Sequence, residues 1–178
     1  MKKPILIPVI TIVLAAGILF GVTFALNGSA AKNAQAEHLK IMQTVLPGSV
    51  NFVVEPYTGD DANIRSVHKA ENGFVIETVT AGYAGDITML IGVSNEGTVT
   101  GVVVRKMSET FGLGANSLAD HVFLSQFLNT SGEAEVGTTV DAITGATVTS
   151  KAIARSVNSA VAFVTGADTE SGATSWGG

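Results

Sequence analysis

The sequence predicts an α+β protein in which one N-terminal transmembrane helix is followed by a single exposed domain with an antiparallel sheet and packed helices. Three observations lead to this class. Residues 4–26 carry no charge, strand-like segments follow one another through short turns between residues 64 and 106, and residues 149–164 have the apolar spacing of an amphipathic helix. Consecutive strands joined by tight turns pair in antiparallel fashion, and separate runs of strands and helices are typical of α+β domains.

Composition places part of the chain in lipid and excludes several kinds of site. Of the 178 residues, 46% are hydrophobic and 14% are charged, whereas soluble domains carry about 25% charged residues. The net charge of −5 argues against a nucleic-acid partner, which would require a basic face. The chain has no cysteine and only three scattered histidines, so it offers no disulfide, thiol nucleophile or paired-histidine metal motif. We therefore expect a membrane protein without a metal site.

Residues 1–26 are predicted to form a transmembrane anchor. The uncharged stretch 4–26 would rise roughly 34 Å as a helix, and the hydrocarbon core of a bilayer is about 30 Å thick. The apolar core of a cleaved signal peptide is shorter, at about 7–15 residues. Lys2 and Lys3 lie directly before the span, whereas Lys32 and Lys40 after it are diluted by Glu37, and a long domain is translocated largely regardless of its charge. We therefore expect a single-pass protein of the cell membrane with a cytoplasmic N-terminus and an extracytoplasmic domain. A signal peptide cleaved near residues 29–31 is the alternative.

The span itself carries small residues at four-residue spacing, namely Gly17, Gly21 and Ala25. Small residues on one helix face allow a second membrane helix to approach closely. Glycine and alanine are frequent in membrane spans, and this alone explains the pattern. A docking face for a partner membrane subunit is the alternative hypothesis.

Residues 27–48 are predicted to be a juxtamembrane stalk, followed by the exposed domain at 49–165 and a flexible tail at 166–178. The stalk contains a helix over residues 36–46, which ends at Pro47-Gly48. Its apolar positions have helical spacing: Leu39, Met42, Val45 and Leu46.

The strands of the domain are predicted at residues 64–70, 74–80, 86–93 and 98–106. The third strand alternates clearly, with Ile87, Met89, Ile91 and Val93 on one face. Asn72-Gly73 is a hairpin signal between the first two strands, and residues 95–97 form a second turn.

Two further helices are predicted after a loop at residues 107–117. Residues 118–128 have a helical pattern with Leu118, Val122 and Phe123 as apolar positions. Residues 133–140 form a polar connection. The helix at 149–164 is strongly amphipathic, and its apolar stripe consists of Ile153, Val157, Ala160, Val161 and Val164.

The stretch DAITGATVTS at residues 141–150 is the most informative part of the chain. Asp141 is expected to open a turn, and Thr149 or Ser150 to cap the helix that follows. Thr147 would then lie just before a helix N-terminus, where free N–H groups and a partial positive charge favour a phosphate. The intervening residues are small and let a bulky group approach the backbone: Thr144, Gly145, Ala146 and Thr147. An ordinary turn with a hydroxyl cap is the alternative.

The tail contains a second match to the same pattern. Ser171-Gly172-Ala173-Thr174 also has an aspartate three residues before it, at Asp168. Thr147 precedes a strong amphipathic helix, whereas Thr174 lies four residues from the end of the chain. This context favours Thr147 as the site.

Residues 141–147 resemble the covalent flavinylation motif Asp-x-x-[Ser/Thr]-Gly-Ala-Thr of the FMN-binding domain family. The chain is similar to two members of that family, the G subunit of the Rnf electron-transport complex and the C subunit of the sodium-translocating NADH:quinone reductase. The resemblance implies that FMN is bound to Thr147 by a phosphoester, which a flavin transferase makes from FAD with release of AMP. It further implies that neighbouring residues serve transferase recognition and phosphate packing: Asp141, Thr144, Gly145, Ala146, Thr149 and Ser150.

A second signature of that family, Glu-Thr-Pro-Gly-Leu-Gly, is similar to residues 109–114. The resemblance implies that this loop forms one wall of the cofactor site through Glu109, Thr110, Gly112, Leu113 and Gly114. Phe111 stands where the family has proline, so the backbone of this loop is less constrained. A glycine-rich turn leaving a strand is the alternative.

The resemblance implies an electron-transfer subunit of an ion-translocating oxidoreductase complex, with other membrane subunits as partners. In an Rnf-type complex, electron flow between ferredoxin and NAD is coupled to Na⁺ or H⁺ translocation. The flavin carries the redox chemistry, and no pair of side chains for hydrolysis is apparent. Two alternatives remain: a stand-alone anchored flavoprotein that passes electrons to an external acceptor, and a flavin-free anchored binding module.

Overall fold

The computed structural model describes residues 33–107 and 121–167. The predicted anchor, the loop at residues 109–114 and the second motif match at Thr174 lie outside the described residues. A helix is predicted at 36–46, and the structure has one over residues 33–45. The compact unit that carries the sheet begins within it at Ile41. Within the described part of the chain, none of the helices has the length and apolar character needed to cross a membrane.

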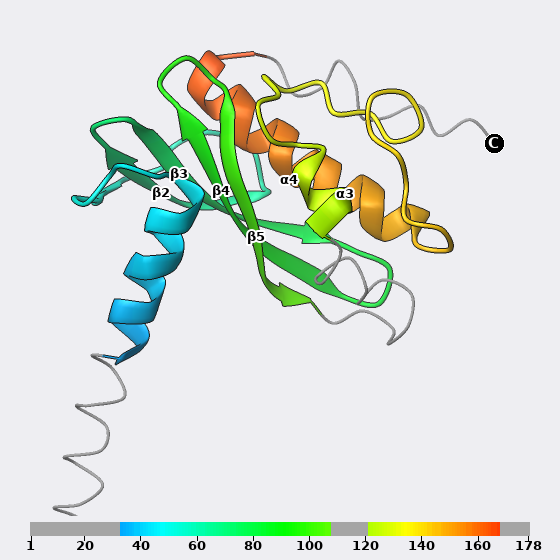
Figure 1. Cartoon of the computed structure of the whole chain (residues 1–178), viewed down its shortest axis with the longest axis horizontal. Helices are drawn as coiled ribbons and strands as arrows, with labels where there is room; N and C mark the ends of the chain where they lie inside the picture. Colours follow the sequence, from blue (N-terminus) through cyan, green and yellow to red (C-terminus); the bar gives the residue numbers. More distant parts are fainter. Residues whose placement is uncertain (1–32, 108–120, 168–178) are drawn as a thin grey trace, which may run out of the picture. The chain divides into compact units, whose positions relative to one another are not determined.

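A five-stranded antiparallel sheet forms the centre of the domain (Figure 1). Each strand pairs with its neighbours in sequence, in the order β1-β2-β3-β4-β5. The antiparallel sheet and the four predicted strands are confirmed to within one residue at their ends. The bounds of the strands are β1 Val53–Glu55, β2 Ile64–Ala70, β3 Gly73–Ala81, β4 Asp86–Ser94 and β5 Val99–Met107.

The hairpin between β2 and β3 turns one residue earlier than predicted. Ala70 pairs with Gly73, so Glu71 and Asn72 form the turn and Gly73 is already the first residue of β3. Gly73 has a φ of 154°, and a Cβ atom there would collide with the carbonyl oxygen of Val93. A side chain is excluded at this position because β4 passes directly beside it.

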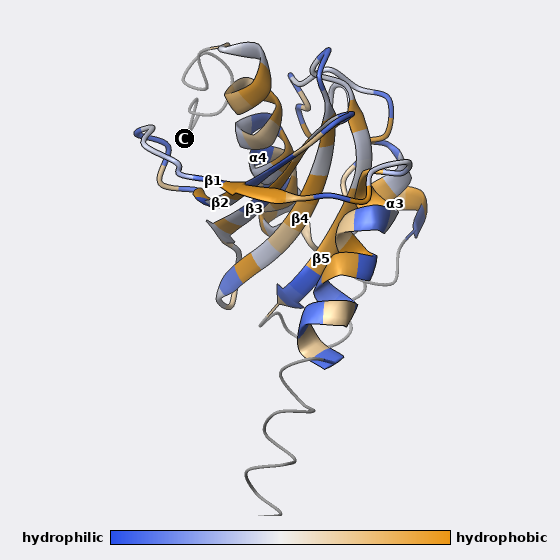
Figure 2. Ribbon diagram, turned by 90° about the vertical axis from the view of Figure 1, so that its left-hand side faces the viewer, coloured by the Kyte–Doolittle hydropathy of each residue, from blue (hydrophilic) through white to orange (hydrophobic). Residues whose placement is uncertain are grey.

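β4 is buried on both faces and contributes side chains to two hydrophobic clusters, one on each side of the sheet. Ile87, Met89, Ile91 and Val93 are fully buried against α4 (Thr147–Thr165) and its surroundings, as their alternation predicted. Leu90 faces the opposite side and packs with Met42, Val45 and Leu46. The apolar colouring of β4 in Figure 2 reflects this double burial.

Helix α4 lies along one face of the sheet (Figure 1). Its predicted stripe is confirmed, since Ile153, Val157, Ala160 and Val161 are buried and Val164 is partly buried. The hydroxyl of Thr80 lies 2.8 Å from that of Ser156 and donates a 3.2 Å hydrogen bond to the carbonyl oxygen of Ala152. These contacts place the first turns of α4 beside the end of β3.

α3 (His121–Ser125) is shorter than the predicted helix at 118–128. Residues 126–129 turn instead of continuing the helix, and residues 118–120 lie outside the described part. Phe123 and Phe127 are buried with their rings 5.3 Å apart in an edge-to-face contact. Val122, predicted as an apolar position, is 78% exposed.

Candidate functional site

Thr147 is the first residue of α4, and its side chain is exposed. The first backbone hydrogen bond of the helix runs from the N–H of Ser150 to the carbonyl oxygen of Ala146, at 2.9 Å. The N–H groups of Thr147, Val148 and Thr149 therefore have no carbonyl partner within the helix. The aligned peptide dipoles give this end a partial positive charge.

The predicted N-cap is wrong. Ala146 occupies the cap position, with φ −128° and ψ 37°, and no side chain caps the helix. Thr149 and Ser150 lie inside the first turn and are 1% and 0% exposed. Thr149 precedes Ile153 by four residues and so continues the buried stripe of the helix toward its N-terminus. The helix therefore begins earlier than predicted, its buried stripe includes Thr149, and Thr147 is the exposed first residue.

Ser150 fastens the preceding turn to the helix. Its hydroxyl accepts a 3.1 Å hydrogen bond from the N–H of Ile143 and donates a 3.0 Å bond to the carbonyl oxygen of Ala146. The N–H of Ala146 in turn donates to the carbonyl oxygen of Ile143 at 2.9 Å. Three hydrogen bonds thus close a compact loop directly before Thr147.

The turn is centred on Thr144 and Gly145, three residues after the predicted opening at Asp141. Gly145 has a φ of 78°, a backbone conformation that the third residue of a type II turn requires and that glycine adopts without strain. Asp141, Thr144 and Gly145 are exposed, whereas Ala146 is only 5% exposed. Asp141, Thr144, Gly145 and Thr147 are therefore all exposed along this segment.

Gln126 is a residue of this site that the sequence reasoning missed. Its side-chain carbonyl accepts a 2.8 Å hydrogen bond from the N–H of Asp141, and its amide nitrogen lies 3.4 Å from the carbonyl oxygen of the same residue. The two residues are 15 positions apart in the chain. No local pattern signals this contact, because it depends on how the segment after α3 packs.

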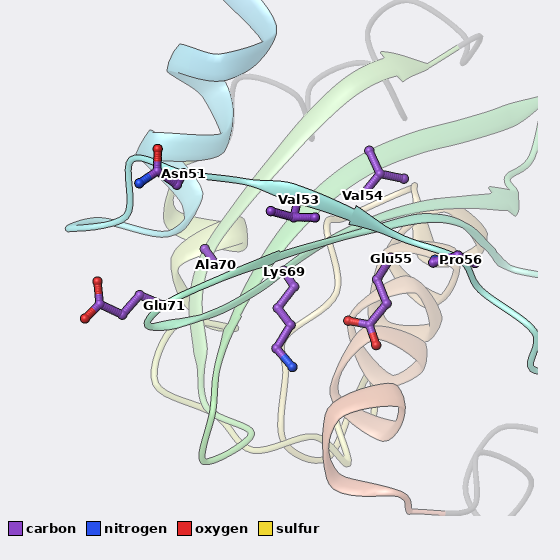
Figure 3. A pocket seen from close by; sticks show the side chains of 8 residues that line it. All are labelled: Asn51, Val53, Val54, Glu55, Pro56, Lys69, Ala70 and Glu71. Atoms are coloured by element: carbon purple, nitrogen blue, oxygen red, sulfur yellow. The ribbon is translucent and has the colours of Figure 1, made fainter.

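A hollow of about 480 Å³ lies elsewhere, at the edge of the sheet formed by β1 (Figure 3). Its lining includes Val53, Glu55 and Lys69, whose side chains come from β1 and β2. Ala70 also lines it and pairs with the first residue of β3. Thr80, which contacts α4, lies seven residues after Gly73 in β3. Roughly 23 Å of strand therefore separates the α4 contact from the end of β3 beside the hollow. This hollow includes none of the predicted site residues.

The start of α4 has the chemistry of a phosphate site. It offers an exposed hydroxyl, helix N–H groups without helical partners and a turn of small residues through which a phosphate can approach the backbone. Among the described residues, no group of three or more histidine, aspartate or glutamate side chains could hold a metal ion. The hydroxyl, the N–H groups and the small residues at the start of α4 fit a phosphate group.

Comparison with known proteins agrees with this geometry. The FMN-binding domain family matches residues 82–162, a range that includes Thr147 and all of its turn. The G subunit of the ion-translocating oxidoreductase complex of Methanosarcina acetivorans is 34% identical over an alignment 177 residues long, and the match covers 90% of this chain and 93% of that protein. The G subunit of the Na⁺-translocating ferredoxin:NAD⁺ oxidoreductase complex of Acetobacterium woodii is 40% identical over 100 residues, covering 50% of this chain and 47% of that protein. The chain therefore belongs to the FMN-binding domain family, among the Rnf complex G subunits.

Proposed function

We propose that this chain is a membrane-anchored electron-transfer subunit of an Rnf-type complex and carries FMN through a phosphoester to Thr147. The observation that carries the proposal is the exposed hydroxyl of Thr147 at the N-terminus of α4, in a chain of this family. Phosphate and helix dipole attract each other, so the same end that presents the hydroxyl also stabilises the ester.

The ester forms by transfer from FAD. The hydroxyl oxygen of Thr147 forms a bond to the phosphorus on the flavin side of FAD, the bond from that phosphorus to the AMP oxygen breaks, and AMP leaves. The proton of the hydroxyl passes to the transferase or to water. Exposure of Thr147 supports this route, because the oxygen is accessible to a separate enzyme in the folded domain.

FMN would supply one- and two-electron redox chemistry, while the protein fixes its position. The names of two relatives support a role between other subunits, since both are G subunits of ion-translocating ferredoxin:NAD⁺ oxidoreductase complexes. The predicted span at residues 4–26 has no ionisable side chain. We therefore assign electron transfer to this protein and the movement of Na⁺ or H⁺ to its partners, with the FMN domain on the extracytoplasmic side.

In-gel fluorescence tests the proposal. The full chain, co-expressed with a flavin transferase and denatured, should give a fluorescent band. Thr147→Ala should abolish the band, and Thr174→Ala, which alters the second motif match, should keep it. A band lost in Thr174→Ala but kept in Thr147→Ala would move the site to the tail. Absence of fluorescence from the wild-type chain would reject the covalent flavin.

A further inference from the structure

We propose that Gln126 is a positioning residue for flavin transfer: its side-chain amide holds the backbone of Asp141 and thereby presents the motif, already folded, to the flavin transferase. This inference rests on the proposed function. It adds a residue from outside the motif to the recognition of the chain by its modifying enzyme.

Both polar atoms of the Gln126 side-chain amide contact the backbone of one residue, Asp141. The carbonyl oxygen of Gln126 accepts from the N–H of Asp141 at 2.8 Å, and its nitrogen donates to the carbonyl oxygen of Asp141 at 3.4 Å. A side chain that satisfies both backbone groups of a residue replaces the pairing that a neighbouring strand would otherwise supply. It fixes the position of that residue along the chain and the plane of its peptide groups.

Gln126 is itself held by the core. Two aromatic residues flank it in and after α3, Phe123 and Phe127, and they are 2% and 0% exposed. The backbone N–H of Gln126 also donates to the carbonyl oxygen of Phe123 at 3.2 Å. The side chain of Gln126 therefore extends from a fixed backbone. Through this side chain, the core determines the position of Asp141 together with the residues next to Asp141 in sequence.

The segment between Asp141 and Thr147 is then anchored at two points. Gln126 holds its beginning, and Ser150 holds Ile143 and Ala146 near its end. The side chains of Asp141 and Thr144 are exposed. A segment with a fixed backbone and exposed side chains loses less conformational freedom when an enzyme binds it than a free loop does.

Gln126 acts through Asp141 and not through the reacting hydroxyl, because its side-chain hydrogen bonds go to the backbone of Asp141. Its loss should therefore weaken binding of the chain by the transferase and leave the transfer step itself almost unchanged. In kinetic terms, the KM for the chain rises and kcat does not fall. Substitution of a residue that only supports the fold would lower thermal stability without raising KM selectively over kcat.

The test uses the full chain in detergent, produced without a transferase, together with purified flavin transferase and FAD. Initial rates of in-gel flavin fluorescence are measured over a range of chain concentrations. Gln126→Met keeps the length of the side chain and removes both hydrogen bonds, and it should raise KM about tenfold with kcat within about twofold. Gln126→Glu keeps the acceptor for the N–H of Asp141 but places an acceptor oxygen opposite the carbonyl oxygen of Asp141, so it should recover only part of the loss.

Ser125→Ala is the matched control, because the Ser125 hydroxyl is exposed and bonds to the carbonyl oxygen of Val122 within its own helix. It should have the KM of the wild-type chain. An unchanged KM in Gln126→Met, or a loss confined to kcat, would overturn the inference while the proposed function stands. If the wild-type chain accepts no flavin, the proposed function fails and the inference falls with it.

Discussion

The hydroxyl of Thr100 donates a 2.6 Å hydrogen bond to the carbonyl oxygen of Val45, and so joins β5 to the end of the helix at residues 33–45. The last carbonyl groups of a helix have no partner within it. Thr100 satisfies one of them and fixes the point at which the chain enters the sheet. This contact is possible because Gly92 and Gly101, which pair across β4 and β5, leave room for the backbone of Val45.

Gly92→Ala should therefore destabilise the domain strongly. A Cβ atom at this position would collide with the carbonyl oxygen of Val45, and backbone atoms of a packed helix cannot move aside at low cost. We expect a loss of about 3 kcal/mol or more in the free energy of unfolding, measured by urea denaturation with circular dichroism. Gly137→Ala is the control: it has open space and a φ of 94°, so it should cost only about 1–2 kcal/mol. Equal losses in the two variants would contradict the packing argument.

Ser150→Ala should loosen the turn before Thr147. The N–H of Ile143 would lose an acceptor that is itself fully buried, at a cost of about 1–3 kcal/mol. Hydrogen exchange at the amide of Ile143 should accelerate together with this loss. Thr165→Val removes a hydroxyl that bonds the carbonyl four residues earlier in the same way, but at the exposed end of α4, and should change stability by less than about 0.5 kcal/mol. Unchanged exchange in Ser150→Ala would show that the turn is held by other contacts.

Periodicity and turn residues predicted the sheet and α4, because each of these elements buries one face and repeats accordingly. The alternation of β4 and the stripe beginning at Ile153 identified buried positions correctly. β1 was missed because its three residues do not alternate: Val53 and Val54 are adjacent and are 68% and 66% exposed. Its orange ribbon in Figure 2 shows this apolar composition. β1 exists because of its pairing with β2, which no local pattern reveals.

Part of the candidate site could likewise be predicted from the sequence and part could not. The position of Thr147 next to a helix start followed from the small residues of its motif and the stripe of α4. The N-cap position did not follow, because Thr149 is buried in the folded domain and lies inside the helix, which its preference for cap positions does not reveal. Gln126 could not be predicted either, since its bond to Asp141 joins two irregular segments that meet only in the folded domain.

Flavinylation at Thr147 should stabilise the domain. The proposed phosphodiester would carry a negative charge at the N-terminus of a 19-residue helix, which no side chain caps. We expect the modified chain to exceed the unmodified one by about 0.3–1 kcal/mol in the free energy of unfolding at low ionic strength. Added salt screens the interaction, so the difference should shrink between low and high salt. Urea denaturation of the two forms of the same chain measures both effects. A gain that does not respond to salt would assign the stabilisation to contacts of the flavin ring.

Assembly with membrane partners should depend on the small-residue face of the predicted span. Gly21→Ile adds a branched side chain where a second helix would approach, so it should lower co-purification of the partner proteins severalfold from detergent-solubilised native membranes. Thr23→Ile is the control, because two residues along a helix place it on nearly the opposite face and it introduces the same side chain there. Both variants should remain in the membrane fraction, since neither introduces a charge. Quantitative mass spectrometry of the affinity-purified chain measures the partners. Equal recovery of partners with Gly21→Ile and Thr23→Ile would show that the glycines serve no docking role, and that contacts of the exposed domain hold the chain in its complex.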